Sequence, residues 1–156
     1  MSGELAIRRA RAEDAAAVHD LQRRAFLCEA RLYADDSLPP LTEPEAVTAR
    51  AVAEECVLLA RLDGRPAGTV RGVARDGTCY VGRLAVDPEL FRRGIGEALM
   101  RELESRFPEA GRFEIFTGHK SAAPLRLYGK LGYAVFREKP IHDGLTIVFM
   151  EKWRKG

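Results

Sequence analysis

The sequence predicts an α/β fold built on a single mixed, mostly antiparallel sheet with helices on both faces. Segments with strand and helix character follow the order strand, helix, helix, three strands, helix, strand, helix and two strands. Two strong turn sequences, residues 63–66 and residues 76–77, separate the three consecutive strands. The chain has 156 residues, of which 46% are hydrophobic, and this suffices for one hydrophobic core. We therefore expect a single domain over residues 1–156.

Periodicity and helix-start signals predict the N-terminal elements. Residues 5–8 form a predicted strand, and Asp14 begins an alanine-rich helix with one apolar face. Residues 29–43 have little periodicity and contain two adjacent prolines, which predicts a loop or a broken helix. Residues 45–55 show a second helical pattern, so two helices precede the main run of strands.

The remaining segments complete the mixed layout. Residues 56–62, 67–74 and 78–86 are strand-like runs that the two turns join into an antiparallel meander. A helix, a strand, a helix and two closing strands follow, at residues 94–107, 112–117, 122–131, 133–137 and 145–153. Helices placed between strands in this way lie on both faces of one sheet.

Charge and hydropathy exclude several classes of function. The 25 basic and 23 acidic residues give a net charge of +2, and no long run of like charge forms a nucleic-acid footprint. No apolar stretch is long enough to span a bilayer, and residues 1–4 lack the pattern of a signal peptide. We therefore expect a cytoplasmic protein that binds neither nucleic acid nor membrane.

The three cysteines, Cys28, Cys56 and Cys79, are widely separated and odd in number. They form no metal-ligand pattern, so we expect no metal site. Cys56 and Cys79 lie in or beside strand-like runs, where a buried small apolar side chain is the ordinary role of cysteine. We expect none of the three to act as a nucleophile.

Residues 81–100 are the most informative stretch, because an apolar strand runs through a basic, glycine-bearing turn into an amphipathic helix. Gly94 and Gly96 lack a Cβ, so a ligand can approach their amides closely. A helix start also leaves about four N–H groups unpaired, with the positive end of the helix dipole behind them. A phosphate fits such a site. On this feature alone, a loop with solvated arginines is an equal alternative.

Two common phosphate motifs do not match these residues. A dinucleotide fingerprint needs a third glycine where this chain has Leu99. A P-loop needs a glycine five residues before its Gly-Lys-Ser sequence. The segment at residues 118–121 has an extra residue inside that sequence and Phe113 at the upstream position. Both motifs are therefore rejected.

The turn at residues 91–96 and the segment Leu127-Tyr128-Gly129-Lys130-Leu131-Gly132-Tyr133 together resemble the GNAT superfamily of acetyl-CoA-dependent N-acyltransferases. The first family motif reads Arg/Gln-x-x-Gly-x-Gly/Ala, and the second reads close to Leu-Tyr-x-Lys-Leu-Gly-Phe/Tyr. Two departures are Phe91, which replaces Arg or Gln, and Ser121, which replaces an asparagine that often opens the second helix. The resemblance covers nearly the whole chain and implies the GNAT fold.

The resemblance also implies a cosubstrate, acetyl-CoA, and the residues that bind it. Backbone amides of the turn would hold the pyrophosphate, and the pantetheine arm would pair with the strand at residues 78–86. In the family this strand and the one at residues 112–117 diverge and leave a gap for that arm. The implied binding residues are Leu84, Ala85, Val86, Arg92, Arg93, Gly94, Ile95, Gly96 and Ser121.

Tyr128 matches the tyrosine that acts as general acid in the family. A phenol with a reference pKa of about 10 stays protonated at neutral pH and can give its proton to a departing thiolate. The alternative is that Tyr128 packs as an ordinary aromatic residue of an amphipathic helix.

The general base is left open by the sequence. Several relatives place a glutamate on the central strand, but residues 80–83 contain no carboxylate. The remaining candidates are Glu29, Asp35, Asp36, Glu43, Glu45, Glu114 and His119. Each could instead be a solvated surface group, and a water relay through Tyr80 is an equal alternative.

The resulting expectation is an N-acetyltransferase that moves an acetyl group to a primary amine of a small molecule by direct attack. The resemblance implies that residues 26–45 and 141–144 wall the acceptor pocket. Carboxylates in the first of these segments would favour a cationic amine, and the alternative is that they are solvated. The alternative is a non-catalytic sensor that binds acyl-CoA in the same gap. A homodimer is compatible with either function.

Overall fold

The computed structural model of the protein describes residues 3–154. Its seven strands, five α-helices and two 3₁₀ helices follow the predicted order. The strands are β1 Leu5–Arg9, β2 Cys56–Leu62, β3 Arg65–Arg75, β4 Thr78–Val86, β5 Arg112–Gly118, β6 Ala134–His142 and β7 Leu145–Trp153. The helices are η1 Ala12–Asp14, α1 Ala15–Tyr33, α2 Pro39–Thr42, α3 Glu45–Glu54, η2 Pro88–Leu90, α4 Ile95–Ser105 and α5 Ala122–Lys130.

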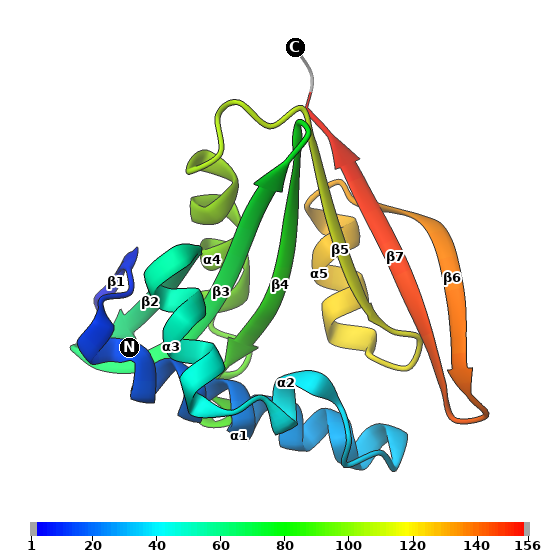
Figure 1. Ribbon diagram of the computed structural model, residues 1–156, viewed down its shortest axis with the longest axis horizontal. Coiled ribbons are helices and arrows are strands. Elements are labelled where there is room, and N and C mark those ends of the chain that lie inside the picture. The colour runs from blue at the N-terminus through cyan, green and yellow to red at the C-terminus, as the bar shows by residue number, and fades with distance from the viewer. Residues whose placement is uncertain (1–2, 155–156) are drawn as a thin grey trace.

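The strands form one mixed sheet in the order β1-β2-β3-β4-β5-β7-β6. Neighbouring strands are antiparallel except β4 and β5, which run parallel. The meander of β2, β3 and β4 is confirmed, and so is the mostly antiparallel α/β layout (Figure 1).

Helices cover both faces of the sheet, as predicted. On one face, Leu99 and Leu103 of α4 pack with Leu131, which follows α5, in the larger core. On the other face, Val18 of α1 and Val52 of α3 form a smaller core with alternate residues of β2. Because β2 is buried on both sides, its sequence is a nearly continuous apolar run.

Residues 29–43 were predicted as a loop or a broken helix, and they form a broken helix, because α1 continues to Tyr33 and a separate short helix follows. The last turns of α1 bury Ala30 and Tyr33 and leave most positions between them exposed, so the apolar stripe is narrow there. The helix ends at Ala34, whose φ of 50° is left-handed. Only the short helix α2, with proline in its first turn, lies in the rest of that segment.

The other element boundaries shift by smaller amounts. The strand predicted at residues 133–137 continues to His142, and every residue of that edge strand is exposed. Such a strand shows little alternation of burial to mark its end. Gly132 follows α5 with a φ of 101°, a conformation that favours glycine at the end of a helix.

The sheet splits in its middle, and α1 lies across the open end of the split. Figure 1 shows β4 and β5 close together at one end and far apart at the other. The blue and cyan helix α1 runs below both halves at that wide end. At its far end, the Asp35 carboxylate lies 2.9 Å from Nε2 of His142, at the end of β6. Among residues 3–154, no helix is long and apolar enough to cross a membrane.

Candidate active site

The split between β4 and β5 begins immediately after three paired positions. Thr78, Cys79 and Tyr80 pair with residues 112–114, and beyond them β4 pairs only with β3 within the described chain. A bulge at Arg83, whose φ is 55°, interrupts the pairing with β3 and bends the strand. The edge of β4 that carries the backbone of residues 84–86 therefore faces the split without a strand partner.

The helix α4 begins where β4 ends, after a turn with two left-handed residues. Arg92 has a φ of 66° and Gly94 a φ of 77°. No side chain caps the helix, and its first backbone hydrogen bond joins the Ala98 amide to the Gly94 carbonyl. A Cβ built on Gly94 would meet no other atom within 4 Å. The amides at this helix start are therefore exposed to an open space where an anion fits.

The remaining turn residues differ in what they offer to a ligand. The side chains of Arg92 and Arg93 are exposed. Ile95 is buried in the core, so only its backbone can meet a ligand. Gly96 is a packing position, because a Cβ there would lie 3.3 Å from Leu127 of α5 and close to Val86. This glycine lets the start of α4 approach both α5 and β4.

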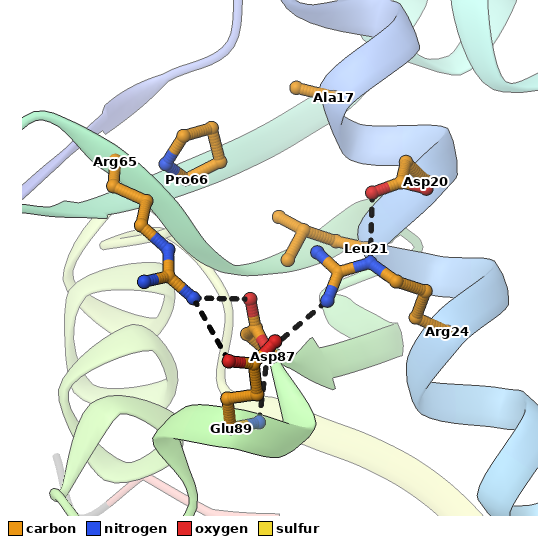
Figure 2. Close-up of a pocket in the computed structure, with 8 residues that line it drawn as sticks. All are labelled: Ala17, Asp20, Leu21, Arg24, Arg65, Pro66, Asp87 and Glu89. Carbon is orange, nitrogen blue, oxygen red and sulfur yellow. Dashed lines mark hydrogen bonds and ion pairs between the residues drawn. The ribbon is translucent and has the colours of Figure 1, made fainter.

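A cluster of ion pairs braces the segment just before the turn. The buried Asp87 accepts from the Glu89 amide at 2.9 Å and pairs with Arg24 at 3.1 Å and Arg65 at 3.4 Å. Although burial opposes it, these contacts hold the pKa of Asp87 below its ordinary value. Figure 2 shows the two arginines on either side of Asp87, in a surface hollow between α1 and the start of β3. The cluster joins the end of β4 to α1.

Tyr128 projects from α5 with its ring buried and its hydroxyl unpartnered. The residue is 4% exposed, and its ring centroid lies 6.1 Å from that of Tyr133. Its hydroxyl forms no hydrogen bond with the described residues. Burial, followed by the nearby Glu29 charge, raises the pKa of Tyr128, so the phenol stays protonated at neutral pH. The ring packs as in the structural alternative, while the hydroxyl is free to donate.

Ser121 takes part in a hydrogen-bonded chain between α1 and the start of α5. The Tyr33 hydroxyl lies 2.7 Å from Ser121 Oγ and accepts from the Lys120 amide at 2.9 Å. Ser121 Oγ donates to the Glu29 carboxylate at 3.0 Å. Ser121 is only 3% exposed, so its hydroxyl is occupied inside the protein.

Glu43 was a candidate base, and the structure excludes it from that role. Its side chain is 5% exposed and accepts hydrogen bonds from Arg71 at 2.9 Å, Arg83 at 3.2 Å and Thr48 at 2.7 Å. Burial raises the pKa of Glu43, but the hydrogen bonds from Arg71 and its neighbours lower it to about 2. A carboxylate held this way does not take a proton at neutral pH. It is also not the solvated group that the sequence suggested.

Most other candidates are paired or fully exposed. Hydrogen bonds from Ser37, followed by His142, lower the pKa of Asp35 to about 2. Glu114 on β5 pairs with Arg112 at 2.9 Å. The other three candidate bases, Asp36, Glu45 and His119, are exposed at the surface.

Glu29 differs from all of these candidates. It lies partly buried on α1, and within residues 3–154 no cation pairs with it. Burial raises the pKa of Glu29, although the hydrogen bond from Ser121 opposes the change.

The remaining predicted groups are placed as follows. Tyr80 lies at the closed end of the split, with the Arg75 guanidinium 4.9 Å from its ring centroid. Burial raises the pKa of Cys79 to about 12 and also raises that of Cys56, so neither thiol is activated. Cys28 is exposed. The described residues contain no group of three or more potential metal ligands.

Several solved structures share this fold over nearly the whole chain. A putative acetyltransferase from Salmonella typhimurium, solved with acetyl-CoA, has a TM-score of 0.73 and 23% identity, covering 96% of this chain and 93% of its own. The Escherichia coli ribosomal-protein-S18-alanine N-acetyltransferase has a TM-score of 0.79 and 20% identity, with coverage of 98% and 97%. PaiA N-acetyltransferase from Thermoplasma acidophilum, solved with coenzyme A, has a TM-score of 0.70 and 17% identity, with coverage of 97% and 99%.

The sequence comparisons agree with the fold. No curated protein matches the chain. The family model described as the acetyltransferase (GNAT) family matches residues 15–133, which include the split, the glycine turn and Tyr128. Acetyl-CoA is the cosubstrate of such enzymes, and the open helix start beside the unpaired edge of β4 fits it. The chain belongs to the GNAT family of acetyltransferases.

Proposed function

We propose that the protein transfers an acetyl group from acetyl-CoA to a primary amine of a small molecule by direct attack. The observation that carries this proposal is the early separation of β4 from β5 beside the uncapped start of α4. This arrangement leaves free backbone groups along one edge and free amides at its end. Neither Cys56 nor Cys79 offers an activated thiol for an acetyl-enzyme.

Each part of the site has a separate task in this proposal. The amides at residues 94–96 hold the pyrophosphate, with Arg92 and Arg93 adding positive charge beside it. The edge of β4 at residues 84–86 pairs with the pantetheine arm as an added strand would. Acetyl-CoA supplies the acyl group on a thiolate that can leave. The Tyr128 hydroxyl donates a proton to the sulfur as the bond to carbon breaks.

The surroundings of the acceptor favour a small amine. The end of α1 contacts the end of β6 through Asp35 and His142, which narrows the open end of the split. Fewer carboxylates of residues 26–45 are free to attract a cationic amine than the sequence suggested, because Glu43 pairs with two arginines. Glu29 is the unpaired carboxylate that interacts with Tyr128. One neighbour is named for a protein acceptor, so a peptide belongs among the compounds to be tested.

The test follows the release of coenzyme A thiol from acetyl-CoA over a panel of amines. The panel contains a polyamine, an aminoglycoside, an amino-acid amide and a peptide with a free N-terminus. We expect acetyl-CoA to raise the melting temperature and one class of small amine to give turnover. Binding without turnover of any amine would favour the sensor instead, and turnover of the peptide alone would contradict a small acceptor.

A cytoplasmic location and a homodimer stay predictions. Cell fractionation checks the location, and sedimentation checks the assembly.

A further inference from the structure

Between α1 and the start of α5, a chain of hydrogen bonds runs toward one carboxylate. The carboxylate of Glu29 accepts from Ser121 Oγ at 3.0 Å. Since the one hydroxyl proton of Ser121 goes to Glu29, the Tyr33 hydroxyl must donate to Ser121, 2.7 Å away. Tyr33 in turn accepts from the Lys120 amide at 2.9 Å. Every donor in this chain therefore points along it toward the carboxylate of Glu29.

The chain is fixed by close packing as well as by hydrogen bonds. The Tyr33 phenol lies directly on the backbone of Gly118, the last residue of β5, where an added Cβ would overlap its ring. The His119 ring packs beside it, with the two centroids 6.0 Å apart. A side chain at position 118 would thus displace Tyr33, and this explains why glycine ends β5. The packing sets where the end of α1, and Glu29 with it, meets α5.

Helix geometry brings Glu29 to the same part of the split as Tyr128. Ser121 is the residue just before α5, and Tyr128 lies seven positions further along the chain, about two helical turns away. Side chains on a helix lean toward its N-terminus, which directs the Tyr128 phenol back toward Ser121 and Glu29. The charge of Glu29 is close enough to raise the pKa of Tyr128. Glu29 on α1 and Tyr128 on α5 are therefore near enough to influence each other electrostatically.

We propose that Glu29 accepts the proton of the attacking amine, and that Ser121 and Tyr33 are positioning residues that hold its carboxylate. This proposal rests on the proposed N-acetyltransferase function. The lone pair of the neutral amine forms the bond to the acetyl carbon, and the C–S bond breaks with its electron pair on sulfur. The amine proton goes to Glu29, while the Tyr128 proton goes to sulfur. Transfer of the proton from Glu29 to the Tyr128 phenolate then restores both groups.

The electrostatic surroundings suit this task. The ionisable groups that interact with Glu29 are Tyr33 on its own helix and Tyr128 on α5, and burial raises the pKa of each phenol. Both phenols are neutral at pH 7, and no cation of residues 3–154 pairs with the Glu29 carboxylate. Burial raises the pKa of Glu29 itself, which moves it toward the range where a general base works well.

The test compares three variants by their pH profiles of kcat at saturating acetyl-CoA and amine. Glu29→Gln should lower kcat by about 10²–10⁴ and remove the acid limb of the profile. Ser121→Ala should lower kcat less than Glu29→Gln does and should move that limb to higher pH, because the lost hydrogen bond had favoured the ionised carboxylate. Glu54→Gln changes an exposed carboxylate at the end of α3, outside the predicted acceptor pocket, and serves as the matched control, with the parent profile expected.

Two further measurements separate this inference from its alternatives. The profiles are measured with an alkylamine and an amino-acid amide, because a limb caused by the acceptor would move with the acceptor's own pKa. The shift in melting temperature with acetyl-CoA checks that each variant is folded and binds its cosubstrate. If Glu29→Gln fails to fold, the pH of the acid limb in Ser121→Ala decides whether Glu29 is the proton acceptor.

The outcomes that overturn the inference differ from those that overturn the proposed function. Normal kcat and an unchanged acid limb in folded Glu29→Gln, or an unmoved limb in Ser121→Ala, would remove Glu29 as the proton acceptor while leaving an active acetyltransferase. A parent protein that turns over no amine would overturn the proposed function, and this inference with it.

Discussion

Glu43 and Glu29 are both buried or half-buried carboxylates of the N-terminal helical region, and their surroundings are opposite. Glu43 is held by Arg71 from β3 and Arg83 from β4, within one half of the sheet. Glu29 on α1 accepts a hydrogen bond from Ser121 at the start of α5, and no cation of the described chain pairs with it. Consequently the pKa of Glu43 falls to about 2, whereas burial raises that of Glu29.

This difference separates a structural acid from one available for chemistry. Two guanidinium groups compensate the charge of Glu43 and fix the start of α3 against β3 and β4. The Glu43 carboxylate therefore stabilises the fold and does not accept a proton at neutral pH. Glu29 keeps the ability to take up a proton because, within residues 3–154, no cation compensates its charge. The predictions below use this contrast, starting with the largest expected effect.

The largest effect should come from the donor that faces Glu29. Tyr128→Phe removes one hydroxyl that has no partner within the described chain, so turnover should fall by about 10²–10⁴ while folding and acetyl-CoA binding persist. Steady-state kinetics and the shift in melting temperature with acetyl-CoA check this in one variant. Near-normal turnover with unchanged acetyl-CoA binding would mean that Tyr128 only packs in the core and does not act as the general acid.

The next effect tests Glu43 against Glu29 directly. Glu43→Gln leaves two partly buried arginines without a counter-charge, so the free energy of unfolding at pH 7 should fall by about 3 kcal/mol. For a chain of this size that lowers Tm by about 6–12 °C. Glu29→Gln should not lower the free energy of unfolding, because it removes an unpaired charge. Chemical unfolding measures the free energy of unfolding of both variants. Equal losses in the two variants would contradict the proposed difference between Glu43 and Glu29.

The pH dependence of stability should differ in sign between the two acids. The pKa of Glu43 is about 2 in the folded protein and ordinarily 4.5, so its contribution is complete above pH 4.5 and is lost as the pH falls toward 2. Glu29 has a raised pKa, so its contribution decreases as the pH rises above 4.5. Unfolding curves from pH 3 to pH 7 should show the stability gap between parent and Glu43→Gln closing at low pH. A constant gap would mean that Glu43 is not the group that titrates.

A smaller effect tests the anion site away from both acids. Gly94→Val places a branched side chain in a left-handed conformation and adds a Cβ in the open space before α4, so acetyl-CoA affinity should fall about tenfold or more. Gly77→Val is the matched control, since Gly77 has a φ of 82° and similar open space in the distant β3–β4 turn. Calorimetric titration measures both. If Gly94→Val and Gly77→Val bind acetyl-CoA with equal affinity, the pyrophosphate does not bind at the start of α4.

The fold was predictable from the sequence because its signals are local. Turn residues and periodic apolar positions predicted the meander, and the two-motif resemblance predicted the split. The end of α1 was missed because exposed positions such as Leu32 weaken its stripe. Periodicity describes single elements and carries no information on where two strands part.

The site was only partly predictable, because its electrostatics depend on distant partners. Arg71 and Arg83 lie 28 and 40 positions after Glu43, with no local pattern to join them. Glu29 and Ser121 are 92 positions apart. The sequence could name seven candidate bases, but only tertiary structure shows which of them are neutralised.

The central claim is that the split between β4 and β5 holds acetyl-CoA, and amide hydrogen exchange with and without acetyl-CoA tests it most directly. Amides of residues 84–86 that face the split and amides of residues 94–97 lack partners in the free protein, so they should exchange more slowly when acetyl-CoA is bound. The β2–β3 turn should be unaffected. Protection at both segments would support the claim, whereas saturating acetyl-CoA that protects neither segment would contradict it.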